Sequence, residues 1–117
     1  MPFDPIDFYY LAGWLYLQSS PHDEARARAI VSRAYYGAFL AARNRAGIGD
    51  KSSGVHKRVH QYYTNAGRAA LANRLDDSRI RRNDADYDTT LKITSLDSGN
   101  ALKLAKRILA EVGVAVQ

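Results

Sequence analysis

The stretch Ser32-Arg33-Ala34-Tyr35-Tyr36-Gly37-Ala38-Phe39-Leu40-Ala41-Ala42 decides the fold, because it lies within the longest and most regular helical pattern of the chain. Its apolar residues recur three and four positions apart, which is the spacing of one face of an α-helix. Gly37 and the alanines leave the helix surface thin, so a neighbouring helix can approach closely. The pattern predicts a helix that starts at the capping-box-like Ser20–Asp23 and stops at Gly47, a natural C′ residue.

One further helix is expected before this segment and another after it. Asp4 followed by Pro5 predicts an N-cap and a first helical position, and an amphipathic helix then runs to about Leu17. Its apolar positions are Phe8, Leu11, Trp14, Leu15 and Leu17. After a loop rich in Gly and Ser, another helix is expected to begin near Ser53 and to bend near residues 65–67. Its inward positions are Val55, Val59, Tyr62 and Tyr63.

The second half of the chain carries the remaining helical signals. Helicity resumes through Leu71, Leu75 and Ile80 and is expected to break over the polar run 84–90. Thr94 and Asp97 form a capping-box pattern that opens a last helix, which Gly113 ends. The apolar positions of that helix are Leu96, Ala101, Leu104, Ala105, Ile108, Leu109 and Val112.

These elements predict an all-α fold, an antiparallel bundle of four to five helices joined by short loops. No segment alternates apolar and polar residues as a half-buried strand does. With 117 residues the chain has the length of one domain, so residues 1–117 are expected to form a single helical domain.

Charge and composition limit the classes of function. The chain has 17 Lys and Arg against 12 Asp and Glu, a net charge of +5. An excess of this size favours anionic partners only slightly, since a well-solvated surface explains it almost equally well. The absence of cysteine excludes disulfides and thiolate chemistry. No apolar stretch approaches the roughly 20 residues of a membrane span, and the first residues lack the features of a signal peptide. We therefore expect a cytoplasmic protein without membrane contact.

Histidines and tyrosines are the other candidate site residues. His56 and His60 have metal-ligand spacing, but no carboxylate at helical spacing accompanies them. We expect no metal and no cofactor, with His56 hydrogen-bonded near a helix start and His60 at the surface. Adjacent tyrosines such as Tyr35 and Tyr36 point about 100° apart, so one of each pair fits the core and the other the rim. The alternative is a platform on which bases stack.

The basic segment 79–88 is the most informative for function. Arg79, Arg82 and Asp86 are spaced three and four apart, so they share one face if the helix persists that far. Planar guanidinium groups suit bidentate recognition of phosphate. The alternative is an arginine–aspartate network that ties the segment to the bundle. Arg33 also requires a partner on its otherwise apolar helix face, and Asp86 is a candidate.

Taken together, two segments resemble signatures of the HEPN family of small helical bundles. Residues 32–42 are similar to that family's second-helix signature, and Leu75, Arg79 and residues 82–87 resemble its second signature. His56 after a Ser-Gly loop and the closing helix after Thr94 fall in the matching order.

The resemblance implies an antiparallel bundle of about five helices that is often a homodimer. Many members of the family are toxins, defence effectors or partners of a minimal nucleotidyltransferase. Active members are metal-independent RNA endonucleases that use an arginine, the polar residue after it and a histidine a turn or more further on. Dimerisation brings two such motifs to one cleft, where histidine acts as general acid or base and arginine steadies the phosphate.

The chain departs from the active pattern at one position. Arg82 and Asn83 match its opening residues, but Tyr87 occupies the position of the histidine. An ordinary phenol ionises near pH 10 and is a poor base at neutral pH. The variant Arg-x-x-x-Asp-Tyr is similar to that of many non-catalytic members, for which nucleotide or partner binding is the usual suggestion.

The sequence therefore predicts a dimeric HEPN-like module that binds RNA, a nucleotide or a nucleotidyltransferase partner in a toxin–antitoxin or defence-type system. The expected binding residues are Arg79, Arg82, Asn83 and Tyr87, supported by Arg33, Tyr36 and Asp86. The alternative is an active metal-independent endoribonuclease whose catalytic candidates are Arg82, Asn83 and Tyr87, with Tyr87, Asp86 or His56 replacing the missing histidine. A third hypothesis is a structural subunit whose basic face meets an acidic protein.

Overall fold

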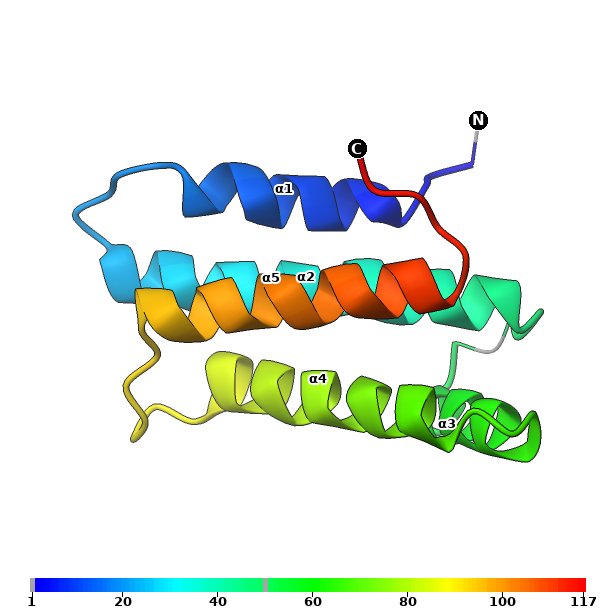
Figure 1. Cartoon of the computed structure of the whole chain (residues 1–117). Helices are drawn as coiled ribbons and strands as arrows, with labels where there is room; N and C mark the ends of the chain where they lie inside the picture. The colour runs from blue at the N-terminus through cyan, green and yellow to red at the C-terminus, as the bar shows by residue number, and fades with distance from the viewer. Residues whose placement is uncertain (1, 50) are drawn as a thin grey trace.

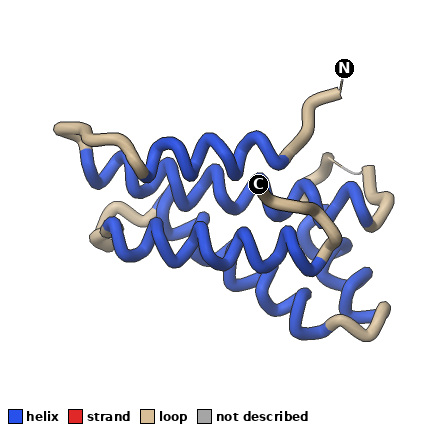
Figure 2. The backbone as a smooth tube through the Cα atoms, turned by 45° about the horizontal axis from the view of Figure 1, so that its top comes forward, coloured by secondary structure: helices blue, strands red, loops and turns tan. Residues whose placement is uncertain are grey.

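The computed structural model describes residues 2–49 and 51–117, which form five α-helices joined by loops (Figures 1 and 2). These are α1 (Ile6–Tyr16), α2 (Asp23–Arg45), α3 (Val55–Asn65), α4 (Ala69–Tyr87) and α5 (Ser95–Glu111). The described residues contain no strand. The expectation of an all-helical bundle is thereby confirmed. No helix in these two ranges is both long and apolar enough to cross a membrane.

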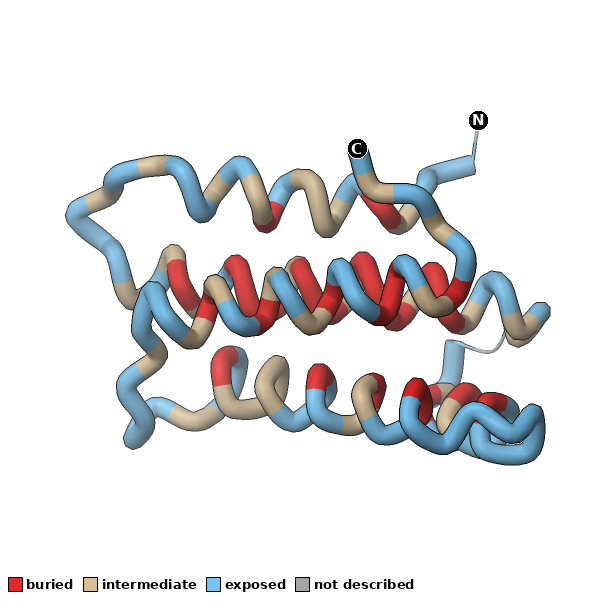
Figure 3. Tube along the Cα trace, viewed as in Figure 1, coloured by how far each residue is buried: buried red, intermediate tan, exposed pale blue. Residues whose placement is uncertain are grey.

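Helix α2 forms the centre of the bundle, because α1, α4 and α5 all pack against it. Its buried residues occur on several sides of the helix and include Ile30, Tyr35 and Phe39 (Figure 3). The buried cluster that they join extends to Val59 of α3, Leu75 of α4 and Ile108 and Leu109 of α5. A helix that is covered on several sides requires small residues wherever a neighbouring backbone comes close.

Gly37 is a point of close approach between α1 and α2. A Cβ atom built on Gly37 would lie 2.9 Å from the backbone nitrogen of Tyr9. A side chain at this position would therefore force the two backbones apart. The thin surface expected from the sequence around Gly37 is what admits α1.

The ends of the helices follow the sequence signals in part. Gly47 and Gly113 adopt φ angles of 72° and 80°, so both occupy the left-handed conformation that ends a helix. Thr94 and Asp97 form the expected capping box at the start of α5. The expected capping box at Ser20 is wrong, since α2 begins at Asp23 without a side-chain cap and Ser20 Oγ instead accepts from the backbone N–H of His22.

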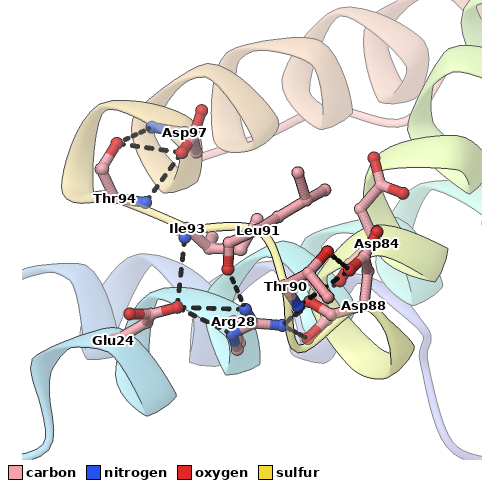
Figure 4. Close-up of polar contacts among 10 residues, drawn as sticks. Glu24, Arg28, Asp84, Asp88, Thr90, Leu91, Ile93, Thr94 and Asp97 are labelled. Atoms are coloured by element: carbon pink, nitrogen blue, oxygen red, sulfur yellow. Dashed lines mark hydrogen bonds and ion pairs between the residues drawn. The ribbon is translucent and has the colours of Figure 1, made fainter.

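The break expected from Asp84 onward is also wrong, because α4 continues to Tyr87. Arg28 of α2 explains this extension, since its Nη1 donates to the backbone oxygens of Asp84, Ala85 and Asp88 (3.3, 3.0 and 3.0 Å; Figure 4). The carbonyls at a helix C-terminus have no partner within the helix and carry partial negative charge. A guanidinium supplied from outside satisfies them and allows a polar sequence to remain helical.

Arg28 also fixes the loop that follows α4. Its Nη2 donates to the carbonyl oxygen of Leu91 at 2.6 Å and to Oε2 of Glu24 at 3.0 Å. Oε2 of Glu24 accepts in addition from the backbone N–H of Ile93 at 3.3 Å (Figure 4). The Arg28 hydrogen bond lowers the pKa of the exposed Glu24 carboxyl. One ion pair on α2 therefore holds both the end of α4 and the connection to α5.

Several apolar positions face outward, contrary to the sequence expectation. Leu11, Trp14 and Leu17 are exposed, as are Tyr62 and Leu96. In α1 the reason is that nearly every position is apolar, so periodicity does not distinguish the inner face from the outer one. Contact with α2 determines which side of α1 faces inward, and it buries Ile6 and Ala12.

Two glycine substitutions test the close approach of α1 to α2. Gly37→Ala is expected to lower the free energy of unfolding by about 1–3 kcal/mol, because the added methyl group overlaps the α1 backbone. Gly13→Ala is the matched control, since a Cβ at Gly13 meets nothing within 4 Å. It is expected to raise stability by about 0.5–1 kcal/mol through helix propensity. Urea unfolding of both variants measures the difference, and a Gly37→Ala protein as stable as Gly13→Ala would contradict this packing.

Arg28→Met tests the clamp on α4. Methionine retains much of the side-chain volume but leaves the backbone oxygens near residues 84–91 without their donor. The expected loss is about 2 kcal/mol of unfolding free energy, with faster amide exchange in residues 88–93. Arg43→Met on the same helix is the control, because among the described residues Arg43 hydrogen-bonds only the side chain of its neighbour Asn44. Equal stability of the two variants would show that Arg28 is dispensable.

Candidate functional site

The two sequence motifs meet where α2 packs against α4. Arg82 of α4 places its guanidinium carbon 5.1 Å from the ring centre of Tyr35 and 5.6 Å from that of Tyr36. Tyr87, one turn further along α4, has its ring centre 5.9 Å from the same carbon. Three aromatic rings from two helices thus surround one cation, an arrangement in which the ring faces attract the positive charge.

Arg33 continues the same surface toward α1. Its guanidinium carbon lies 5.0 Å from the ring centre of Tyr36 and 5.1 Å from that of Phe8. Cations and rings therefore alternate across three helices. We call this set the aromatic–guanidinium strip; its members are Phe8, Arg33, Tyr36, Arg82 and Tyr87.

A hydroxyl and a carboxylate link the two arginines. Ser32 is buried, and its Oγ donates to Oδ2 of Asp86 at 3.2 Å and accepts from Nη2 of Arg33 at 3.3 Å. Oδ2 of Asp86 also lies 3.8 Å from Nη1 of Arg82. The expected pairing of Arg33 with Asp86 is thus indirect, through Ser32, and the carboxylate pairs directly with Arg82.

Arg82 uses little of its hydrogen-bonding capacity within the described chain. The contact with Asp86 is longer than a hydrogen bond, and the buried Nε has no hydrogen-bond partner among the described residues. The side chain is 14% exposed, so rings hold it in place while part of the guanidinium still reaches the surface. The exposed part of such a guanidinium is preorganised to donate to an anion at the surface.

The other two predicted binding residues are placed differently. Arg79 is exposed and forms no ion pair or hydrogen bond with any described residue, but its charge acts on both Tyr35 and His56. Asn83 is half-buried, next to Arg82 in sequence, and likewise has no hydrogen bond within residues 2–49 and 51–117. Neither is part of the strip, although Arg79 adds positive charge beside it.

His56 lies behind the strip, not on it. It is 7% exposed, its ring stacks on that of Phe39, and its Nδ1 is 2.9 Å from the hydroxyl oxygen of Tyr35. Its Nε2 is 3.5 Å from Oδ1 of Asp76, and this contact does not have hydrogen-bond geometry. The carboxylate favours the tautomer with the proton on Nε2, in which Nδ1 accepts from Tyr35. The expectation of a hydrogen bond near the helix start is confirmed, and burial makes His56 a structural residue.

Burial also sets the ionisation of this pair. Loss of hydration lowers the pKa of His56 to about 4, and the positive charge of Arg79 contributes in the same direction, while Asp76 opposes both. Burial raises the pKa of Tyr35 to about 12 against the opposing charge of Arg82. Both groups are therefore neutral at neutral pH, as a buried hydrogen-bonded pair requires.

His60 is half-buried, and its Nε2 lies 3.1 Å from Oδ2 of Asp76, which also neighbours His56. Among the described residues, no group of three or more His, Cys, Asp or Glu side chains could hold a metal ion. The expected division of each tyrosine pair is confirmed for Tyr35 and Tyr63, which are buried, and for their more exposed neighbours Tyr36 and Tyr62.

Three residues of this region were absent from the candidates drawn from the sequence. Ser32 lies in the motif directly before Arg33, and that position is the signal for it in the sequence. Tyr35 lies in the core, yet its ring also bounds Arg82. Phe8 belongs to a helix that is apolar on all sides, so nothing in the sequence marked the side on which it meets Arg33.

The chain was compared with protein-family models, with curated proteins and with solved structures, and nothing matched in any of the three.

Stability as a function of pH tests the buried state of His56. Because the folded pKa is about 4 and a free histidine has a pKa near 6.5, the unfolded chain binds the extra proton first. This contribution is fully present above about pH 6.5 and is lost as the pH falls toward 4. Urea unfolding at neutral and at mildly acidic pH is therefore expected to show a smaller loss for His56→Gln than for the wild type. His22→Gln, at an exposed histidine, is the control and should keep the wild-type loss.

If His56→Gln and the wild type lose the same stability between the two pH values, His56 is not buried as a neutral group.

Proposed function

We propose that the chain is an HEPN-like module that binds single-stranded RNA along the aromatic–guanidinium strip without cleaving it. The observation that carries the proposal is the alternation of guanidinium groups and rings from Phe8 to Tyr87. Surfaces that bind single strands combine positive charge for the backbone with aromatic faces for the bases.

Phosphate recognition is assigned to the arginines. Arg82 is held in place by rings with 14% of its side chain exposed, and Arg79 is exposed beside it without an ion pair in the described chain. Arg33 engages only Ser32 Oγ among the described hydrogen-bond acceptors. The net charge of +5 adds long-range attraction for a polyanion.

Base recognition is assigned to Tyr87, which is 73% exposed at the end of α4. One side of its environment is occupied by the Arg82 guanidinium, and much of the side chain remains open to solvent. Stacking of a base on such a ring is sequence-tolerant and contributes about 1–3 kcal/mol. Tyr36, which lies between Arg33 and Arg82, is half-buried and supports the cations on both sides.

Binding without cleavage is favoured by the state of the groups that would replace the missing histidine. His56 is buried, and its lowered pKa leaves it unprotonated at neutral pH, so it offers neither access nor an acid. Asp86 accepts a hydrogen bond from Ser32 through Oδ2, which also neighbours Arg82. His56 is not accessible to a ribose hydroxyl, which a general base must contact directly or through one water.

Relationship to the HEPN family is supported by architecture and by the meeting of the two signatures. Five helices form the bundle, and the segments that resemble the family lie against each other through Arg82, Tyr35, Ser32 and Asp86. Two separate sequence resemblances that converge on one surface are easier to explain by a common function than by bundle packing alone.

Binding of a labelled single-stranded RNA, followed by fluorescence anisotropy at low and at physiological salt, tests the proposal. Tyr87→Ala is expected to weaken binding by about tenfold or more, which corresponds to the loss of one stacked base. Arg79→Gln is expected to weaken binding and to reduce the slope of log K against log salt by about 0.7, the contribution of one phosphate contact to a single strand.

Two variants serve as matched controls. Arg107→Gln removes the same charge from an exposed site on α5, and Tyr62→Ala removes an exposed tyrosine from α3. Both should bind within about twofold of the wild type, allowing for the altered net charge. If Tyr87→Ala and Arg79→Gln bind RNA no worse than these controls, the strip and the adjoining Arg79 are not the binding site. Cleavage of the RNA by the metal-free wild type would replace binding with the endoribonuclease alternative.

A further inference from the structure

The last turn of α4 carries Tyr87 at the very end of the helix, where order is hardest to maintain. The turn comprises residues 84–87, and Ala85 is the only one of them that is buried. The side chain of Tyr87 is 73% exposed, so its own packing contributes little to holding the turn. Helix ends fray, because the last backbone carbonyls have no partner within the helix. The position of the Tyr87 ring therefore depends on contacts that other helices make with this turn.

The guanidinium of Arg28 binds backbone oxygens that precede and follow Tyr87 in the chain. Its Nη1 donates to the carbonyl oxygens of Asp84 at 3.3 Å and of Ala85 at 3.0 Å, which come before Tyr87. It also donates to the carbonyl oxygen of Asp88 at 3.0 Å, directly after Tyr87 (Figure 4). One side chain of α2 thus holds the backbone on both sides of the residue to which base stacking is assigned.

Glu24 fixes the direction of the Arg28 side chain. Oε2 of Glu24 accepts from Nε of Arg28 at 3.2 Å and from Nη2 at 3.0 Å. The Arg28 side chain is 19% exposed, so little of it is free to turn toward solvent. Both residues belong to α2, the helix against which α1, α4 and α5 pack. The contact with the end of α4 is therefore attached to the centre of the bundle.

Arg28 extends the side of α2 that forms the candidate site. Arg28, Ser32 and Tyr35 are spaced four and three residues apart, which places them on one side of the helix. The other two contact Asp86 and Arg82 of α4. Within the described part of the chain, Arg28 itself forms no hydrogen bond, ion pair or cation–ring contact with a side chain of the strip. Its influence on the Tyr87 ring is exerted through the backbone of α4.

We propose that Arg28 is a positioning residue for RNA binding: it holds the last turn of α4 so that Tyr87 stays beside Arg82, without contacting RNA itself. The inference rests on the RNA-binding function proposed above. A ring that is held in place before binding loses less conformational freedom when a base stacks on it. If the turn is ordered for only part of the time, the apparent affinity falls in proportion to that fraction.

RNA binding by Arg28→Met, followed by fluorescence anisotropy, tests this role. Arg28→Met is expected to bind about three- to tenfold more weakly than Arg43→Met, and no more weakly than Tyr87→Ala combined with Arg43→Met. Arg43→Met is the matched control, because it removes the same charge from the same helix at a residue that hydrogen-bonds its neighbour Asn44. Circular dichroism verifies that each variant is folded under the conditions of the assay.

Double variants separate the positioning of Tyr87 from a general loss of stability. Once Tyr87→Ala has removed the ring, adding Arg28→Met is expected to weaken binding no more than adding Arg43→Met does, about twofold or less. In combination with Arg79→Gln the effect of Arg28→Met should persist in full, because Arg79 lies about two turns before Tyr87 in α4. A merely structural role of Arg28 would weaken binding equally in both backgrounds.

Backbone dynamics provide a readout that needs no RNA. Amide order parameters measured by NMR are expected to fall at residues 86–88 of Arg28→Met and to stay unchanged at residues 71–75, in the first half of α4. Arg43→Met should leave both segments as they are in the wild type.

The role of Arg28 and the RNA-binding function fail in different ways. If Tyr87→Ala weakens binding but Arg28→Met and Arg43→Met bind equally, the role of Arg28 is overturned and the binding site stands. An effect of Arg28→Met that persists in full after Tyr87→Ala overturns it as well, as do unchanged order parameters at residues 86–88. If Tyr87→Ala binds RNA like the wild type, the RNA-binding proposal fails and the role of Arg28 in it fails too.

Discussion

The position of α2 inside the bundle constrains everything else in the structure. A helix in contact with α1, α4 and α5 has no fully solvated side, so each of its positions must suit the neighbour that it meets. Where the backbone of α1 comes close, only glycine fits, at Gly37. Where α4 crosses, flat rings and a buried serine fill the contact, and these groups become the inner wall of the candidate site.

This packing brings polar groups of α2 and α4 together, and arginines on the two helices are accommodated there in different ways. Arg28 supplies donors to the exposed carbonyl end of α4 and so keeps that helix intact as far as Tyr87. Arg82, by contrast, lies among tyrosine rings and stays 14% exposed, so part of its guanidinium reaches the surface. The acceptors nearby therefore determine the role of each arginine. Arg28 satisfies backbone carbonyls, whereas Arg82 keeps part of its guanidinium at the surface.

Two exposed surfaces of the molecule differ in chemistry. The aromatic–guanidinium strip joins positive charge to rings, a combination typical of surfaces that bind a polyanion with stacked bases. The exposed side of α1 is apolar instead, since Leu11, Trp14 and Leu17 lie on it.

The sequence by itself determined the helical fold and most helix boundaries, and it indicated the segment around Arg82 as a candidate site. These follow from local chemistry: apolar spacing, the left-handed glycines Gly47 and Gly113, and the Thr94–Asp97 capping box all act within a few residues. The tertiary structure alone decided three further points. It extended α4 to Tyr87 through Arg28, a residue far away in the chain; it joined Arg33 to Asp86 through Ser32; and it turned Trp14 outward. Each depends on contacts between helices or on which side of an apolar helix meets its neighbour, and local periodicity carries no information on either.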